Sequence, residues 1–136
     1  MFKKVLLLAS AGLMVMGSAA AAEKVKIGFV TTITTPAGVI GRDMVDAVNL
    51  AMEDIGGKMA GRDVELIIED DGFKPAIGKQ KTDKLVKQDK VQFVTGFIWS
   101  HVLLASQKSA LGAGKFLISS NAAVFTSVVI WSAALQ

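Results

Sequence analysis

Residues 26–43, KIGFVTTITTPAGVIGRD, join a short apolar run to a helical pattern through a loop of threonines, a proline and glycines. The run Val25–Thr31 predicts a strand, and the apolar residues spaced through 39–55 predict a helix. The loop contains neither G-x-G-x-x-G nor G-K-[ST], the glycine patterns with which many nucleotide enzymes hold phosphate. The stretch therefore predicts a strand–loop–helix unit, and it raises the question of which ligand other than a phosphate the loop serves.

The same alternation of strand and helix patterns continues to residue 119. Strands are predicted at 64–69, 91–97 and 115–119, and helices at about 75–89 and from Ser100, as N-cap, to about 111. The strands are nearly continuous apolar runs, which indicates burial of both sheet faces under helices. The pattern predicts an α/β fold: an open, doubly wound parallel sheet in a three-layer α-β-α arrangement.

The first 22 residues have the features of an export signal. Two lysines, Lys3 and Lys4, precede the apolar run Val5–Val15 and a stretch of alanines that ends at Ala22. This arrangement favours a cleaved signal peptide over a membrane anchor and predicts an exported protein.

Composition limits the possible functions. Removing Lys3 and Lys4 from the 15 basic residues leaves 13 against 12 acidic ones, and no Arg-rich or aromatic-interleaved stripe is present, so no nucleic-acid partner is expected. The chain has no cysteine, which excludes disulfides and thiolate metal ligands. No cofactor and no metal site are predicted.

Ligands of open parallel sheets bind beyond the carboxyl ends of the strands. That rule selects four loops with mostly hydroxyl and amide side chains, at residues 32–41, 70–74, 98–101 and 120–123. Ser100 follows a strand and opens a helix, so its hydroxyl and the first-turn N–H groups could hold an anion such as a carboxylate. The alternative is that Ser100 only caps its own helix.

Two enzymatic interpretations compete with ligand binding. Asp70 and Asp71 could hold Mg²⁺ for phosphoryl transfer, although a solvated turn before Gly72 is the simpler interpretation. Ser100 and His101 could suggest a hydrolase, but neighbours on a helix do not face each other and no G-x-S-x-G motif is present. A small exported α/β hydrolase or phosphotransfer protein is the alternative function.

Four motifs in order carry a family resemblance over residues 24–122. They are T-x-P-x-G-x-x-G (34–41), E-D-D-G (69–72), G-F-I-W-S (96–100) and I-S-x-N-A (118–122). As a set they resemble the start of periplasmic solute-binding proteins of branched-chain amino acid type ABC transporters. The resemblance implies the type I periplasmic fold, in which two α/β lobes close on a small ligand, with residues 23–122 forming part of the first lobe.

The resemblance also implies a function and site residues. The protein would be the periplasmic substrate-binding component of an importer, not an enzyme. It would bind an amino acid or a related small carboxylate or amide and would deliver it to a membrane permease. Ile40 would pack against the ligand, Ser100 would donate to its carboxylate, and Asn121 and Ala123 would belong to a second contact segment.

Residues 123–136 depart from the resemblance. This stretch is apolar and uncharged, where the family would continue into a loop, a hinge and a second lobe. A frameshift, a partial gene and a genuine single-lobe product are three interpretations, and the abrupt change of composition near residue 123 favours the first. A chain without the second lobe is expected to bind its ligand weakly or undetectably.

Overall fold

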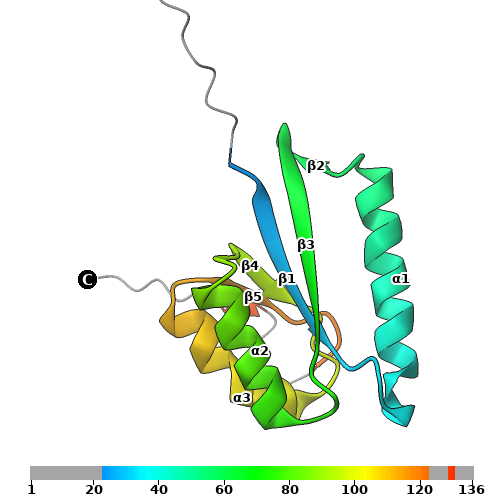
Figure 1. Ribbon diagram of the computed structural model, residues 1–136, viewed down its shortest axis with the longest axis vertical. Helices are drawn as coiled ribbons and strands as arrows, with labels where there is room; N and C mark the ends of the chain where they lie inside the picture. Colours follow the sequence, from blue (N-terminus) through cyan, green and yellow to red (C-terminus); the bar gives the residue numbers. More distant parts are fainter. Residues whose placement is uncertain (1–22, 123–128, 131–136) are drawn as a thin grey trace, which may run out of the picture.

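The computed structural model describes residues 23–122 and 129–130 (Figure 1). In chain order the elements are β1 (Val25–Thr31), the 3₁₀ turn η1 (Pro36–Gly38), α1 (Val39–Asp54), β2 (Lys58–Met59), β3 (Arg62–Asp70), α2 (Pro75–Lys87), β4 (Phe93–Thr95), α3 (Ser100–Gly112), β5 (Phe116–Ile118) and β6 (Val129–Ile130). Each strand and helix predicted up to residue 119 is present, with ends that differ by a few residues.

The sheet has the strand order β2-β3-β1-β4-β5-β6. Strands β3, β1, β4 and β5 are mutually parallel, with Ile27 of β1 beside Leu66 of β3 and Phe93 of β4. Helix α1 lies on one side of the sheet, and α2 and α3 lie together on the other (Figure 1). The predicted doubly wound α/β sheet with three layers is therefore confirmed.

The two edge strands differ from the prediction of a purely parallel sheet. β2 pairs antiparallel with β3, and β6 pairs antiparallel with β5. Each contains two residues, too few for a periodic pattern to show. The chain turns back between β2 and β3 through Ala60 and Gly61, both of which have positive φ. Such a turn lets Lys58 and Met59 lie directly against the start of β3.

The side of the sheet under α2 and α3, the α2–α3 face, holds the main core. Val30, Val94 and Leu117 point to it from three adjacent strands and are buried with residues of the two helices. Helices α2 and α3 approach closely, because a Cβ on Gly78 of α2 would lie 2.3 Å from Val102 Cγ1 of α3. Only glycine at residue 78 permits this contact.

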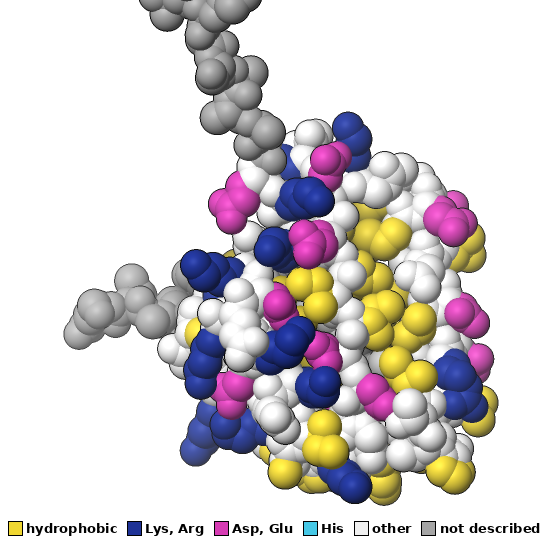
Figure 2. Space-filling model, in the orientation of Figure 1, with side chains coloured by type: hydrophobic (Ala, Val, Ile, Leu, Met, Phe, Trp, Pro, Cys, Tyr) yellow, Lys and Arg dark blue, Asp and Glu magenta, His cyan; other side chains and the backbone are white. Residues whose placement is uncertain are grey.

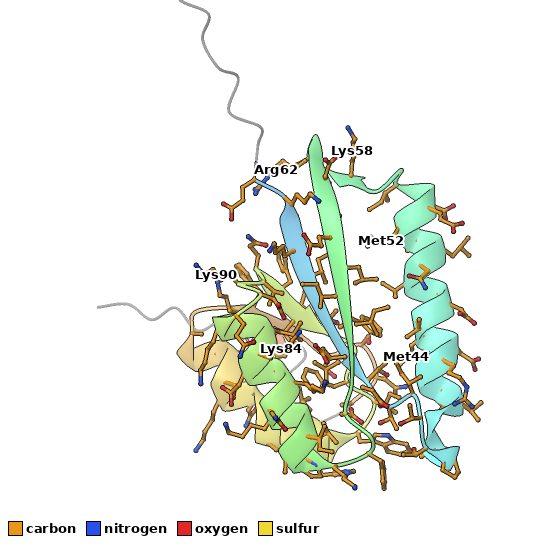
Figure 3. The ribbon with its side chains drawn as sticks, viewed as in Figure 1. Met44, Met52, Lys58, Arg62, Lys84 and Lys90 are labelled. Atoms are coloured by element: carbon orange, nitrogen blue, oxygen red, sulfur yellow. The ribbon has the colours of Figure 1, made fainter. Side chains whose placement is uncertain are left out.

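The opposite side, the α1 face, is much less covered. It consists of alternate residues of the same strands: Ile27, Phe29, Leu66, Ile68, Phe93, Thr95, Phe116 and Ile118. Met44 and Met52 extend from α1 toward β3 (Figure 3), but within α1 the structure buries only Gly41 completely. Apolar side chains accordingly remain visible between β3 and α1 in Figure 2.

The bare part of the α1 face lies over β4 and β5. Phe93 and Phe116 stack with ring centroids 5.5 Å apart, and Phe116 and Ile118 are each 41% exposed. A hollow of about 210 Å³ opens there, lined by Ile27, Met59, Phe93, Thr95 and Ile118. Parallel strands normally have helices over both faces. Within the described residues, this half of the sheet therefore has its covering layer on one side only.

A further property concerns membranes. In the described part of the chain, no helix combines the length and the apolar character that crossing a bilayer requires.

Candidate ligand-binding site

The topology makes the ends of β1 and β4 the switch point at which a ligand crevice is expected. These strands are neighbours in the sheet, but the chain leaves β1 toward α1 and leaves β4 toward α3, on opposite sides (Figure 1). Loops that diverge in this way form the ligand crevice of open α/β sheets. The four predicted loops all follow parallel strands of this sheet, at the same edge.

Asp70 ties the end of β3 to the loop after β1. Its Oδ1 accepts hydrogen bonds from the backbone N–H groups of Ile33 and Gly72, both at 2.9 Å, and Oδ2 accepts one from Thr34 Oγ1 at 2.5 Å. Burial raises the pKa of Asp70, but these hydrogen bonds outweigh burial and hold the pKa below its ordinary value. The carboxylate thus fixes the shape of the loop.

Asp71 is fully buried, so the predicted solvated turn is wrong for this residue. Its Oδ1 accepts from Thr32 Oγ1 at 2.5 Å and from the backbone N–H of Phe73 at 2.8 Å. Thr32 is also fully buried, and its Oγ1 accepts from Trp99 Nε1 at 3.1 Å. We refer to this arrangement as the Asp71–Thr32–Trp99 chain. It connects the loops that follow β3, β1 and β4.

Trp99 is half-buried and packs against a neighbouring aromatic side chain. Its ring meets Phe73 edge-on with centroids 4.9 Å apart, and Phe73 meets His101 in the same way at 5.1 Å. Phe73 has a φ of 64°, a strained conformation for a residue with a side chain, and is 42% exposed. Trp99 thus packs within this aromatic cluster, and His101 lies on its exposed side.

Ser100 is the first residue of α3, and the predicted N-cap assignment is wrong. Trp99 occupies the cap position with extended φ and ψ of −105° and 128°. The carbonyl oxygen of Trp99 accepts from the N–H groups of Val102 and Leu103 at 3.1 and 3.0 Å. The prediction failed because helix start was assigned from residue type, whereas the turn at Trp99 is set by its side-chain partners in other loops.

The loop after β5 contacts α1 through Asn121, and Ile40 lies on α1 close to this contact. Asn121 Nδ2 is 4.0 Å from Met44 Sδ, and Met44 follows Ile40 by one helical turn. Both Asn121 and Ile40 are exposed, Ile40 by 44%. The N–H of Ala122 donates to Phe97 O at 3.0 Å and ties this loop to the one after β4. The fourth predicted residue, Ala123, lies outside the described residues.

Two acidic side chains, Asp83 on α2 and Glu69 on β3, are paired with lysines of α2. Among residues 23–122 and 129–130, no group of three or more His, Cys, Asp or Glu side chains is placed to hold a metal ion. On α2, Asp83 bonds Lys79 and Lys87, which lowers its pKa to about 2. The basic run on this helix is thus a solvated, ion-paired surface, with Lys84 in Figure 3 reaching Glu69 at 2.7 Å.

Sequence reasoning overlooked Thr32, although the signal was present in the register. Thr31 of β1 pairs with Asp70 of β3, so the next residues along each strand, Thr32 and Asp71, emerge side by side. Two polar residues that end adjacent buried strands can satisfy each other, and such pairing is expected for buried polar groups.

Comparison with known proteins agrees with this fold. Residues 24–133 match the family described as periplasmic binding protein. A comparison with curated proteins gave no match.

Solved structures with similar folds include an ABC transporter substrate-binding protein from Sphaerobacter thermophilus. It is 32% identical, with a TM-score of 0.71 over 75% of this chain and 28% of that one. The branched-chain amino acid transporter substrate-binding protein LivJ from Streptococcus pneumoniae, in complex with isoleucine, is 28% identical, with a TM-score of 0.72 over 76% of this chain and 30% of that one.

A third similar structure is a solute-binding protein from Rhodopseudomonas palustris BisB5 in complex with 3,4-dihydroxybenzoic acid. It is 27% identical, with a TM-score of 0.70 over 73% of this chain and 27% of that one. The chain thus spans less than a third of the length of these structures. The family and these neighbours are substrate-binding proteins of ABC transporters, not enzymes. Together the fold and the match over residues 24–133 show that this chain belongs to the periplasmic binding protein family.

Proposed function

We propose that the protein is the substrate-binding component of an ABC importer and that its ligand is a small organic acid, either an amino acid or an aromatic carboxylate. The observation that carries the proposal is the topological switch point between the ends of β1 and β4, with the first turn of α3 directly after β4. First-turn N–H groups favour an anion. The neighbours complexed with isoleucine and 3,4-dihydroxybenzoic acid hold ligands that share one group, a carboxylate.

Each predicted contact residue has a role in this proposal. Ser100 donates its hydroxyl to the ligand carboxylate, and Ile40 packs against the apolar part of the ligand. Asn121 and Ala123 supply polar contacts from the loop after β5. The exposure of Ile40 and Asn121 supports these roles, because both side chains are accessible to a solute.

Export and delivery complete the proposal. Proteins of this family act in the periplasm, and residues 1–22 would be the signal peptide that directs the chain there. Residues 23–122 would form part of the first lobe, residues 123–136 a divergent tail, and the receiving partner would be the membrane permease of the importer.

Residues 23–136 alone would bind the ligand weakly. In a two-lobe receptor, the second lobe supplies contacts and excludes water when the lobes close. The chain corresponds to less than a third of its solved neighbours, so it would provide one wall of such a site. We expect a Kd in the millimolar range, which corresponds to about −4 kcal/mol.

Titration monitored by NMR tests this function. Isoleucine and benzoate would be added to ¹⁵N-labelled residues 23–136, and shifts are expected in the amides of the loops after β1, β4 and β5. The Ser100→Ala variant is expected to weaken binding about tenfold, because a hydrogen bond to a charged group is lost. Ser109→Ala, near the other end of α3, is the matched control. Shifts confined to other surfaces, or none with either compound, would contradict the proposal.

A further inference from the structure

Two members of the Asp71–Thr32–Trp99 chain, Thr32 and Asp71, are buried within the loops at the ends of the strands. Thr32 and Asp71 have no exposed surface, so neither can contact a solute that enters from outside. Both hydrogen bonds nevertheless join loops that border the crevice, at 2.5 Å between Thr32 and Asp71 and at 3.1 Å between Trp99 and Thr32. Their effect on a ligand can only be indirect, through the groups that they hold in place.

The direction of these hydrogen bonds is fixed by chemistry. An indole Nε1–H can only donate, and an ionised carboxylate can only accept. The Thr32 hydroxyl has one proton, which it gives to Asp71, and its oxygen accepts the indole proton. Among the described residues Asp71 Oδ2 has no partner, so this carboxylate relies on its Oδ1 contacts with Thr32 and Phe73. Replacing the hydroxyl would therefore leave the Trp99 Nε1–H without this acceptor and would leave the buried Asp71 with the backbone N–H of Phe73 as its remaining donor.

Trp99 transmits this arrangement to α3. Its carbonyl oxygen accepts the N–H groups of Val102 and Leu103, which closes the first turn of the helix. The Trp99 indole donates a hydrogen bond to Thr32 Oγ1 and packs edge-on against the ring of Phe73. The backbone N–H of Phe73 in turn donates to Asp71. The position of Ser100, the next residue, follows from the position of Trp99.

We propose that Thr32 and Asp71 are positioning residues that hold Trp99, and through it the first turn of α3, in the geometry that receives the carboxylate of the ligand. The effect of this role on ligand binding rests on the proposed function. The structural part, the dependence of the α3 start on Thr32, stands on the contacts alone.

NMR of the Trp99 indole separates these two parts. In ¹⁵N-labelled residues 23–136, the Trp99 Nε1–H signal is identified by its loss in Trp99→Phe. Thr32→Val removes the hydroxyl while keeping the shape of the side chain, and Thr32→Ser keeps the hydroxyl. Thr82→Val is the matched control, because Thr82 is equally buried and its hydroxyl bonds Gly78 O at 2.8 Å, a hydrogen bond outside the Asp71–Thr32–Trp99 chain.

Thr32→Val is expected to speed hydrogen exchange of the Trp99 indole about tenfold, the effect of losing one hydrogen bond. It should also shift the amides of residues 100–103 and reduce the response of these amides to isoleucine and benzoate. Thr32→Ser should restore all three properties, and Thr82→Val should leave the indole unchanged even if it lowers stability equally.

An unchanged indole signal and unchanged amides at 100–103 in Thr32→Val would overturn the proposal. If Thr32→Val does not fold, Trp99→Phe tests the same link from its other end, since it removes the indole donor and keeps an aromatic ring. Unmoved amides at residues 100–103 in that variant would overturn the proposal too. If the indole responds but neither solute moves any amide of the unmodified chain, the proposed function fails and the positioning of α3 stands.

Discussion

Leu85 on α2 offers a quantitative test of the packing that places the crevice loops. Its side chain is fully buried in the core of the α2–α3 face. It lies directly on β1, because a Cβ added to Gly28 would be 2.8 Å from Leu85 Cδ1 and 3.2 Å from Cδ2. Leu85→Ala would remove the atoms that fill this space, and few neighbours could replace them since the strand backbone is fixed by its ladder on both sides.

We expect Leu85→Ala to lower the free energy of unfolding by about 3 kcal/mol, within the range for leucine truncation in cores. This corresponds to a shift of about 150-fold in the unfolding equilibrium. Gly28→Ala alone should cost about 1 kcal/mol, because its methyl group crowds the leucine. In the double variant the methyl group enters the vacated space, so the combined cost should be about 1 kcal/mol less than the sum.

Urea unfolding followed by circular dichroism measures these energies. Leu104→Ala on α3 is the control, since Leu104 is 48% exposed, and its truncation should change stability by no more than about 0.5 kcal/mol. Equal losses for Leu85 and Leu104, or strictly additive effects of the Leu85 and Gly28 substitutions, would refute the packing described here. Should Leu85→Ala be unfolded without urea, Leu85→Val provides the same comparison at smaller cost.

Three other substitutions have expected outcomes. Gly41→Ala should lower the Tm by several degrees, whereas Gly112→Ala should not, because a Cβ at 41 would be 1.8 Å from Thr32 O and one at 112 meets nothing within 4 Å. Because the pKa of Asp70 is lowered in the folded state, its carboxylate stabilises the fold at pH values above 3.8, the ordinary pKa of this group. This contribution is lost as the pH falls through the lowered pKa. Asp70→Asn should therefore reduce the urea midpoint at pH 7 and differ less from the unmodified chain in acid. Phe116→Ser should reduce self-association in light scattering, since it removes an exposed aromatic from the α1 face; unchanged association would point to another surface.

The alternating strands and helices were predictable, because a strand that is buried on both faces has a nearly continuous run of apolar residues in the sequence. Val64–Glu69 and Val91–Phe97 could be recognised in this way, and glycine or proline marked the helix ends. The antiparallel edges were not predictable, since two residues such as Lys58 and Met59 carry no period. Their pairing depends on a turn that the local sequence only partly specifies.

The candidate site was predictable in location but not in its supporting contacts. Parallel topology alone gathers the loops at one edge, which is why Ser100 and Asn121 could be selected. Asp71 was assigned to a solvated turn because its burial depends on Thr32, 39 positions earlier in the chain. The start of α3 was misassigned for the same reason, since the partners of Trp99 are distant in sequence. Contacts of this kind become visible only when the register between strands is known.

Because helices cover the two faces of the sheet unequally, we expect the helices to unfold in a defined order. Helices α2 and α3 are locked to the strands by fully buried side chains such as Leu103 and Val94, and exchange of their amides requires most of the core to open. Helix α1 has little buried surface to lose, so it can detach while the rest stays folded. A protease that samples this partly open form would cut first around α1 and the turn at Gly56 and Gly57. The half of the molecule bearing α3 would persist longest, and the wall that α1 contributes to the crevice would be the first to disappear.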